Sequence, residues 1–290
     1  PKTLAERLGY PAGAKLLIVH ADDLGKAHSV NTAASRAFAA GTVNSGSVMV
    51  TCPWFPEIAA YARAHPQADL GLHLTLTSEW SPLRWGPVLS KNLVPSLVDE
   101  HGYLYPTEGE AAAHADARQA EAEIRAQIGL ARAAGIRPTH LDSHMGTLYQ
   151  NESLFRAFMR VARDNQLPVR LSSDWLGRAP FIAPTLTPDD VVIDRIIEIG
   201  PDVTPERWAA FYADAVKGLR PGVTEIVVHI AFDDEEMRGA TFDHPNWGAA
   251  WRQRDFDFFT GDPFRRLLQE NNVKLITWGE IAKLARRPRP

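Results

Sequence analysis

The chain has 290 residues, of which 45% are hydrophobic and 23% charged, and its formal charge is −4. This composition is typical of a globular protein with a large core, and it excludes a disordered, collagen-like or coiled-coil protein. The small acidic excess argues against a nucleic-acid partner, and no apolar run reaches the roughly 18 residues of a membrane span. The one cysteine, Cys52, can form neither an internal disulfide nor a thiolate metal site.

Apolar runs rich in β-forming residues alternate with helical stretches along the whole chain. The expected strands are 16–21, 47–51, 70–75, 139–142, 169–172, 225–231 and 274–277. The expected helices include 29–40, 54–65, 110–135 and 151–165. Strands that alternate with helices pair in parallel. About seven such units predict an α/β fold, a single-domain distorted (β/α) barrel over residues 1–290. Two stretches without periodicity, 78–109 and 173–203, are expected to be long loops at its C-terminal face.

Ionisable residues stand at the ends of four expected strands, where barrel enzymes place their sites. Asp22 and Asp23 directly follow the first strand. Adjacent carboxylates repel each other, so one of them is usually held by a cation, a metal or a shared proton. The alternative is that they cap the following helix.

Histidines occupy the other three strand ends. His73 lies in an apolar strand, where a core histidine is the commoner interpretation and a neutral metal ligand the alternative. Alternation places His140, Asp142 and His144 on one face of their strand. Packing explains such a face poorly, because an unpaired buried charge is costly. His229 ends a later strand, and the acidic run 233–236 after it favours a solvated loop.

These strand ends together indicate a site for one divalent cation with an Asp and two His ligands. Two imidazoles and a carboxylate with open positions form the ligand set of catalytic zinc sites. The same set holds Fe(II) in non-haem oxygenases, so the ligands alone leave the reaction open. The remaining Asp of the pair would then be available as a general base on bound water.

Three motifs carry a resemblance to a known family. They are His20-Ala21-Asp22-Asp23-Leu24-Gly25, Gly71-Leu72-His73-Leu74-Thr75-Leu76 and Thr139-His140-Leu141-Asp142-Ser143-His144. In this combination, and over nearly the whole chain, the sequence resembles the YdjC-like carbohydrate deacetylases.

The resemblance implies a distorted (β/α) barrel that removes N-acetyl groups from amino sugars with one divalent metal ion, Zn²⁺ or Mg²⁺. It implies that the metal ligands are Asp23, His73 and His144. It further implies that Asp22 is the general base and that His229 is the general acid or an oxyanion partner. The chain departs from the family pattern at Gly146, where many members have a second His, and after His229, where many have Pro-Gly.

Further side chains are expected around this site. Asp142 is expected to orient His73 or His144 from behind, and His140 to line the site. Arg170 and Arg254 are candidate partners for Asp22, with exposed surface positions as the alternative.

The substrate is expected to be a small acetylated sugar. Trp80 and Trp85 are expected to stack on a sugar ring at the mouth, with core packing as the alternative. Two alternative functions stay open: a barrel hydrolase or isomerase for another sugar-like substrate, and a sugar-binding protein without turnover.

Compartment and assembly are weakly constrained by the sequence. The chain begins at Pro1 rather than Met. We expect a cytoplasmic protein, with an exported protein as the alternative if a signal peptide preceded Pro1. A homo-oligomer is left open.

Overall fold

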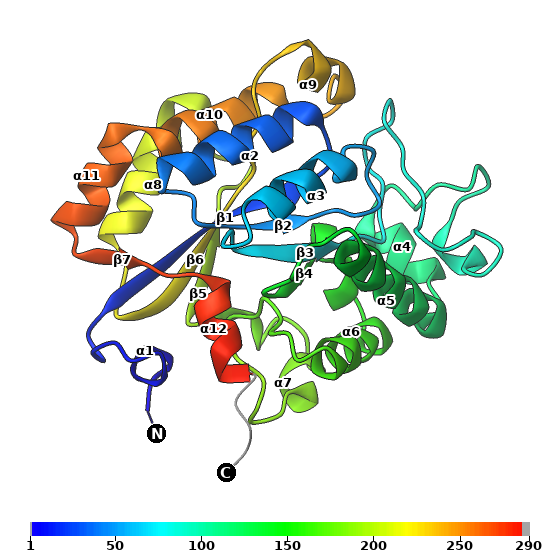
Figure 1. The fold of residues 1–290 in the computed structure, drawn as a ribbon, viewed down its shortest axis with the longest axis horizontal. Helices are drawn as coiled ribbons and strands as arrows, with labels where there is room; N and C mark the ends of the chain where they lie inside the picture. The colour runs from blue at the N-terminus through cyan, green and yellow to red at the C-terminus, as the bar shows by residue number, and fades with distance from the viewer. Residues whose placement is uncertain (1, 286–290) are drawn as a thin grey trace.

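The computed structural model describes residues 2–285 and contains one parallel sheet (Figure 1). Its strands are β1 (Lys15–Leu24), β2 (Ser45–Val48), β3 (Leu70–Leu74), β4 (Leu141–Ser143), β5 (Arg195–Glu198), β6 (Gly222–Val228) and β7 (Val273–Leu275). Their order is β4-β3-β2-β1-β6-β5, and β7 pairs with the first residues of β1. All these pairs are parallel, as the alternation of strands and helices predicts.

Two isolated bridges curl this sheet toward a closed barrel. Val169 bridges Leu141 of β4, and Ser172 bridges Ile193, two residues before β5. The amide of Arg170 donates to the carbonyl of Leu141 over 2.9 Å. The extended segment between the bridges therefore links the two outer strands, and the fold is the distorted (β/α) barrel that the sequence predicts.

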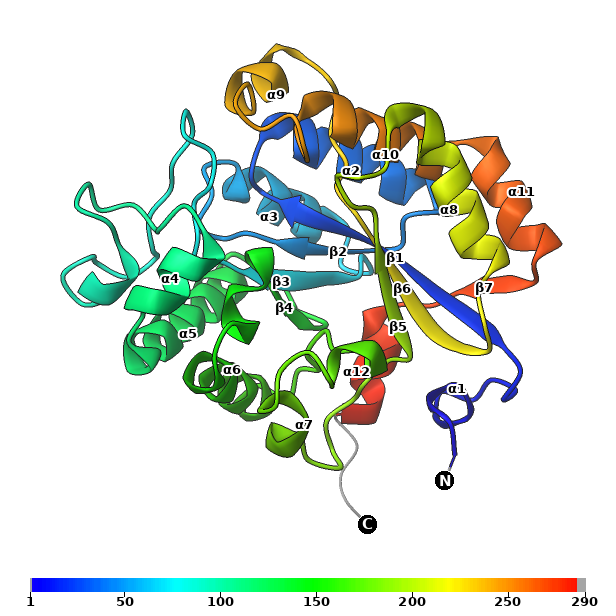
Figure 2. The same ribbon diagram turned by 180° about the vertical axis from the view of Figure 1, so that it is seen from behind.

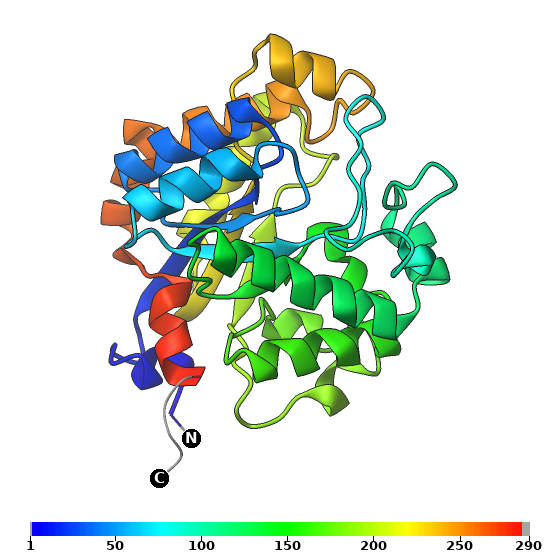
Figure 3. The ribbon, with the colours of Figure 1, turned by 45° about the vertical axis from the view of Figure 1, so that its right-hand side comes forward.

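Helices surround the sheet. They are α1 (Leu4–Arg7), α2 (His28–Ala40), α3 (Phe55–Ala64), α4 (Glu108–His114), α5 (Ala117–Ala133), α6 (Glu152–Asp164), α7 (Ile182–Thr185), α8 (Trp208–Lys217), α9 (Glu235–Ala240), α10 (Ala249–Thr260), α11 (Asp262–Glu270) and α12 (Trp278–Ala285). Four 3₁₀ turns are η1 (Pro95–Leu97), η2 (His144–Tyr149), η3 (Ser173–Trp175) and η4 (Pro205–Arg207). Helices α2, α3 and α10 lie on one side of the sheet, and α5 and α6 lie together on another (Figure 3).

The two ends of the barrel differ. Strand β1 points toward the long loop after β3 and toward α9, whereas α1 lies at its starting end (Figure 2). Within residues 2–285, no helix combines the length and the apolar character that crossing a membrane requires.

Three boundaries differ from the sequence-based expectation. Residues 169–172 form bridges rather than a strand, and β5 lies within 173–203, which was expected to be loop. β5 was missed because it is only partly buried and carries charged residues at both ends. The helix expected over 110–135 is divided into α4 and α5, because the side chain of Asp116 caps the first amides of α5.

The interior of the barrel is apolar at the starting end and polar at the other. Side chains of residues paired in parallel register point to the same face, and alternate residues along a strand share a face. Leu16 and Ile18 of β1 belong to an apolar cluster that Trp278 of α12 helps to close. The polar interior side chains above this cluster are all buried; they are His20, Ser45, Ser47, His73, His140, Asp142, Arg170 and Glu225.

Gly71 makes room for one of these interior side chains. A Cβ added at Gly71 would lie 2.4 Å from the imidazole of His140. We therefore expect Gly71→Ala to lower the free energy of unfolding by about 1–3 kcal/mol, through overpacking. Gly129→Ala is the matched control, because Gly129 is inside α5 and a Cβ there meets nothing within 4 Å. Denaturant unfolding of both variants is the measurement. A Gly71→Ala variant with the same free energy of unfolding as the wild type would contradict the close contact at Gly71.

Candidate metal and catalytic site

Asp22 and Asp23 lie on a β-bulge near the end of β1. Ala21 and Leu24 pair with Gly46 and Val48, so three steps along β1 match two steps along β2. Asp23 has a φ of 70°, in the left-handed region that non-glycine residues rarely adopt. A bulge redirects the side chains that follow it. This one lets two consecutive carboxylates reach the same end of the barrel.

The Asp pair does not cap α2, which was the alternative interpretation of the sequence. The N-cap of α2 is Ala27, which supplies no side-chain hydrogen bond. The amides of His28 and Ser29 instead donate to Glu236, over 3.1 and 2.7 Å. The acidic run 233–236 thus contributes a helix-capping contact, and Asp22 and Asp23 remain available to the site.

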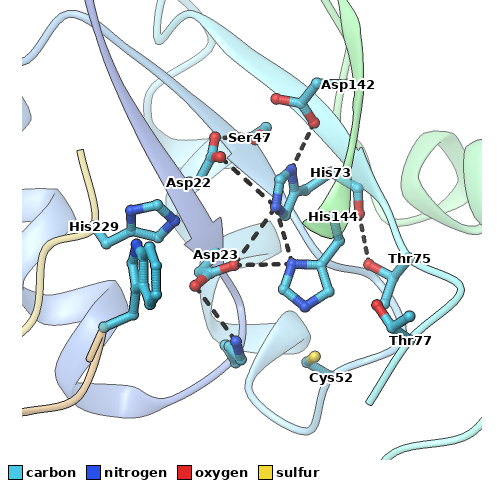
Figure 4. Close-up of polar contacts among 12 residues, drawn as sticks. Asp22, Asp23, Ser47, Cys52, His73, Thr75, Thr77, Asp142, His144 and His229 are labelled. Carbon is cyan, nitrogen blue, oxygen red and sulfur yellow. Dashed lines mark hydrogen bonds and ion pairs between the residues drawn. The ribbon is translucent and has the colours of Figure 1, made fainter. Parts of the chain in front are cut away.

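Three buried ligand atoms meet at this end of the barrel (Figure 4). His73 Nε2 lies 3.1 Å from His144 Nδ1, and Asp23 Oδ1 lies 3.5 Å from the former and 3.4 Å from the latter. Ligands about 2.0–2.2 Å from a tetrahedral ion stand roughly 3.3–3.6 Å apart. Asp23 Oδ1 has no hydrogen-bond partner within residues 2–285. The donor set therefore fits one divalent cation.

Each of the two candidate imidazole ligands has a carboxylate on its other side. His73 Nδ1 contacts Asp142 Oδ1 at 2.7 Å, and His144 Nε2 contacts Glu79 Oε2 at 2.9 Å. A carboxylate behind a metal-binding imidazole fixes its tautomer and raises its basicity. Asp142 orients His73, one of the two options expected. Glu79 was not recognised in the sequence, and its only signal was its position shortly after the strand with His73.

Two cations neutralise the other oxygen of Asp23. Arg252 Nη2 lies 2.5 Å from Asp23 Oδ2, and Lys26 Nζ lies 3.4 Å from it and also contacts Glu79. Burial favours the neutral acid, but Lys26 and Arg252 outweigh it and hold the pKa of Asp23 well below its usual range. Neither cation was among the expected residues. Arg252 gave no signal, because it lies on a helix of mixed charges.

The two tryptophans lie in the wall of the site rather than at its mouth. Trp80 and Trp85 are only 2% and 3% exposed. Lys26 Nζ is 4.0 Å from the ring centroid of Trp80 and 5.4 Å from that of Trp85. The expected stacking face is thus covered, and core packing, the alternative, describes both rings.

Asp22 is held by Arg170. Its two oxygens accept from Nη1 and Nη2 of Arg170, over 2.7 and 3.1 Å. Burial favours the neutral acid, but Arg170 and neighbouring imidazoles keep the pKa of Asp22 well below its usual range. The expected pairing of Arg254 with Asp22 is absent, since the Arg254 guanidinium lies 5.1 Å from the ring centroid of Trp208.

His20 joins Asp22 to Asp142. Its Nε2 lies 3.1 Å from Asp22 Oδ1 and 3.3 Å from Asp142 Oδ2. Burial opposes protonation, but these two adjacent carboxylates raise the pKa of His20 to about 10. His140 stacks on Trp278, 5.0 Å between centroids, with its edge toward His20, so it lines the interior beneath the ligand atoms.

Two other buried groups have metal-like spacing within residues 2–285, and both include Asp142. One combines Asp142 with His20 and His140, the other with Asp22 and His73. Asp142 already contacts Arg170 at 3.0 Å and His73 at 2.7 Å. These contacts favour the group of Asp23, His73 and His144.

His229 lies just beyond β6, on the Asp22 side of the ligand group (Figure 4). Its amide donates to Asp255 Oδ2 over 2.9 Å. Its Nδ1 lies 4.0 Å from Glu198 Oε1 and has no hydrogen-bond partner in the described part of the chain. Burial lowers the pKa of His229 to about 3, so the ring is neutral at neutral pH.

The fold and the site together define the class of this protein. It is a parallel (β/α) barrel with a candidate metal site, formed by an Asp and two His, at the C-terminal ends of its strands. The family model of the YdjC-like proteins matches residues 16–270. The carbohydrate deacetylase of Thermus thermophilus is 34% identical over 284 residues, which cover 96% of this chain and 97% of the relative. The chain therefore belongs to the YdjC-like family.

Two further similarities agree with this placement. The chitooligosaccharide deacetylase of Serratia marcescens is 32% identical over 163 residues, covering 55% of this chain and 60% of that protein. An Enterococcus faecalis V583 crystal structure, assigned provisionally to cellobiose-phosphate cleavage, superposes with a TM-score of 0.79 at 27% identity. It covers 92% of this chain, and 99% of that structure is matched.

The ligand set predicts which variants lose metal. The double variant His73→Ala, His144→Ala removes both imidazole donors, so we expect protein purified without chelator to lose its divalent metal. His229→Ala is the control, because His229 is outside the ligand group. Elemental analysis of both proteins is the measurement. Full metal content in the double variant would rule out these ligands.

The contact between Glu79 and His144 predicts a smaller loss of metal affinity than removal of the imidazoles. Glu79→Gln removes the charge behind His144, and we expect the affinity for Zn²⁺ to fall by about 10–100-fold. Glu152→Gln, an exposed carboxylate on α6, is the control. Competition titrations of metal-free protein with a chelator measure the affinity. An unchanged affinity in Glu79→Gln would show that Glu79 does not support the ligand.

Proposed function

We propose that this protein hydrolyses the acetamido group of an acetylated amino sugar or oligosaccharide with one divalent cation. The observation that carries the proposal is the convergence of Asp23 Oδ1, His73 Nε2 and His144 Nδ1, with the Asp22 carboxylate beside them. The sugar class is supported by the relatives named carbohydrate and chitooligosaccharide deacetylase.

Asp23, His73 and His144 would hold the cation. A cation bound there supplies Lewis acidity toward the acetyl carbonyl and lowers the pKa of a water molecule. Two nitrogen donors and one oxygen donor suit Zn²⁺. The carboxylate and the open positions also admit Mg²⁺, so both ions are candidates.

Asp22 would accept the proton of the attacking water. Its Oδ2 lies 3.8 Å from His73 Nε2, which puts it beside the ligand group without belonging to it. Its low pKa means that this carboxyl is ionised at neutral pH. The two hydrogen bonds from Arg170 fix the orientation of this carboxylate, which is what a general base needs.

His229 would act as the general acid or as a partner of the oxyanion. A neutral imidazole can donate an N–H hydrogen bond to the carbonyl oxygen or to the leaving nitrogen. The position of His229 directly after β6, with its amide bonded to Asp255, supports this role. A general-acid role requires that His229 first receive a proton, because burial lowers its pKa to about 3.

Replacement of the base separates a hydrolase from a sugar-binding protein. We expect Asp22→Asn to retain metal and sugar affinity while acetate release falls by about 10²–10⁴-fold. Asp202→Asn, an exposed carboxylate, is the control. Acetate is measured with a panel of N-acetylated sugars and with metals added back to metal-free protein. If the wild type releases no more acetate than the background from any of these sugars, the deacetylase proposal is wrong. If Asp22→Asn releases acetate at the wild-type rate, the proposed role of Asp22 is wrong.

A further inference from the structure

Glu198 is a carboxylate at the mouth of the barrel that the mechanism above does not use. It ends β5 and pairs with Val227 of β6. Val227 shares a strand face with Glu225, which contacts Arg170 inside the barrel, and with His229 two residues further on. The register therefore directs Glu198 toward the interior side, next to His229.

The carboxylate of Glu198 is open and unpaired. Its side chain is 46% exposed, and Oε1 lies 4.0 Å from His229 Nδ1. Its charge has no cation within ion-pair distance among residues 2–285 other than this distant imidazole, which is neutral. The neighbouring carboxylates differ in this respect, because Asp22 pairs with Arg170 and Asp23 with Arg252.

Hydrolysis of an acetamide produces a cation at this place. Water adds its oxygen to the acetyl carbon and the C–N bond breaks. The nitrogen leaves as an amine, and the two protons of water end on that nitrogen, giving an ammonium group and acetate. If His229 acts on the leaving nitrogen, one of the two roles proposed for it, the ammonium forms within reach of the adjacent carboxylate.

We propose that Glu198 binds the amino group that the reaction frees and makes the site selective for amino sugars. This inference rests on the proposed function. A carboxylate binds an ammonium through a charge-assisted hydrogen bond, which a hydroxyl at the same carbon cannot match. Partial burial, and after it the charge of Asp22, raises the pKa of the Glu198 carboxyl to about 7, so an ammonium bound there would favour its ionised form. Glu198 is a recognition residue in this role, and it takes no proton from water.

The experiment compares two sugars that differ in one group. Glucosamine and glucose are titrated calorimetrically into metal-loaded wild-type protein and Glu198→Gln, at a pH where the amine is protonated and the Glu198 carboxyl, whose pKa is about 7, is ionised. We expect the wild type to prefer glucosamine and Glu198→Gln to lose about tenfold in glucosamine affinity, with glucose binding unchanged. Glu100→Gln, an exposed carboxylate far more open to solvent, is the matched control and should behave as the wild type.

The outcomes keep the two proposals apart. A wild type without preference for glucosamine, or equal losses for both sugars in Glu198→Gln, overturns the ammonium site even if acetate release is normal. A preference that Glu198→Gln removes supports the site even if no tested sugar releases acetate. In that last case the deacetylase proposal fails and the amine-binding site stands.

Discussion

One buried guanidinium organises the polar half of the barrel. Arg170 Nη1 lies within 3.4 Å of three interior carboxylates, Asp22, Asp142 and Glu225. Buried carboxylates are costly without a cation. Arg170 and the protonated His20 supply the positive charge. The same contacts hold the candidate base, Asp22, and the carboxylate behind the ligand His73. The geometry of the proposed chemistry thus depends on an ion network below it.

Asp23 combines two opposing requirements. A buried carboxylate needs positive partners to stay ionised, whereas a metal ligand needs a lone pair without a partner. Arg252 and Lys26 contact Oδ2, and Oδ1 remains directed at His73 and His144. The left-handed backbone at Asp23 makes this division of the two oxygens possible. Arg252 and Lys26 reduce the net negative charge of the site. In the proposed role, the two imidazoles, each backed by a carboxylate, would therefore contribute much of the binding of a metal ion.

The sequence was informative where strand geometry decides position. Asp23, His73 and His144 could be related because parallel strands end at one face, and alternation distinguished Asp142 from its apolar neighbours. Glu79 and Arg252 could not be found this way, since a loop and a helix bring them to the ligands and no periodicity relates them. Trp80 was misplaced because aromatic residues in a loop rich in Pro, Gly and Ser resemble a binding surface. Only the fold shows that the ring packs over Lys26. β5 was missed because its exposed charges obscured the apolar pattern.

The polar side chains on the two sides of the barrel mouth differ in how far contacts within the protein hold them. On the side of β1, β3 and β4, both ligand imidazoles and both aspartates are tied to further charged groups, so their positions are set by the protein itself. On the side of β5 and β6, His229 Nδ1 and the Glu198 carboxylate have no hydrogen-bond partner among the described residues. Polar groups of this kind gain most from an incoming ligand, because binding satisfies them rather than displacing an existing contact. In the proposed mechanism, cation binding and water activation would therefore belong to the first side, and discrimination between sugars to the second.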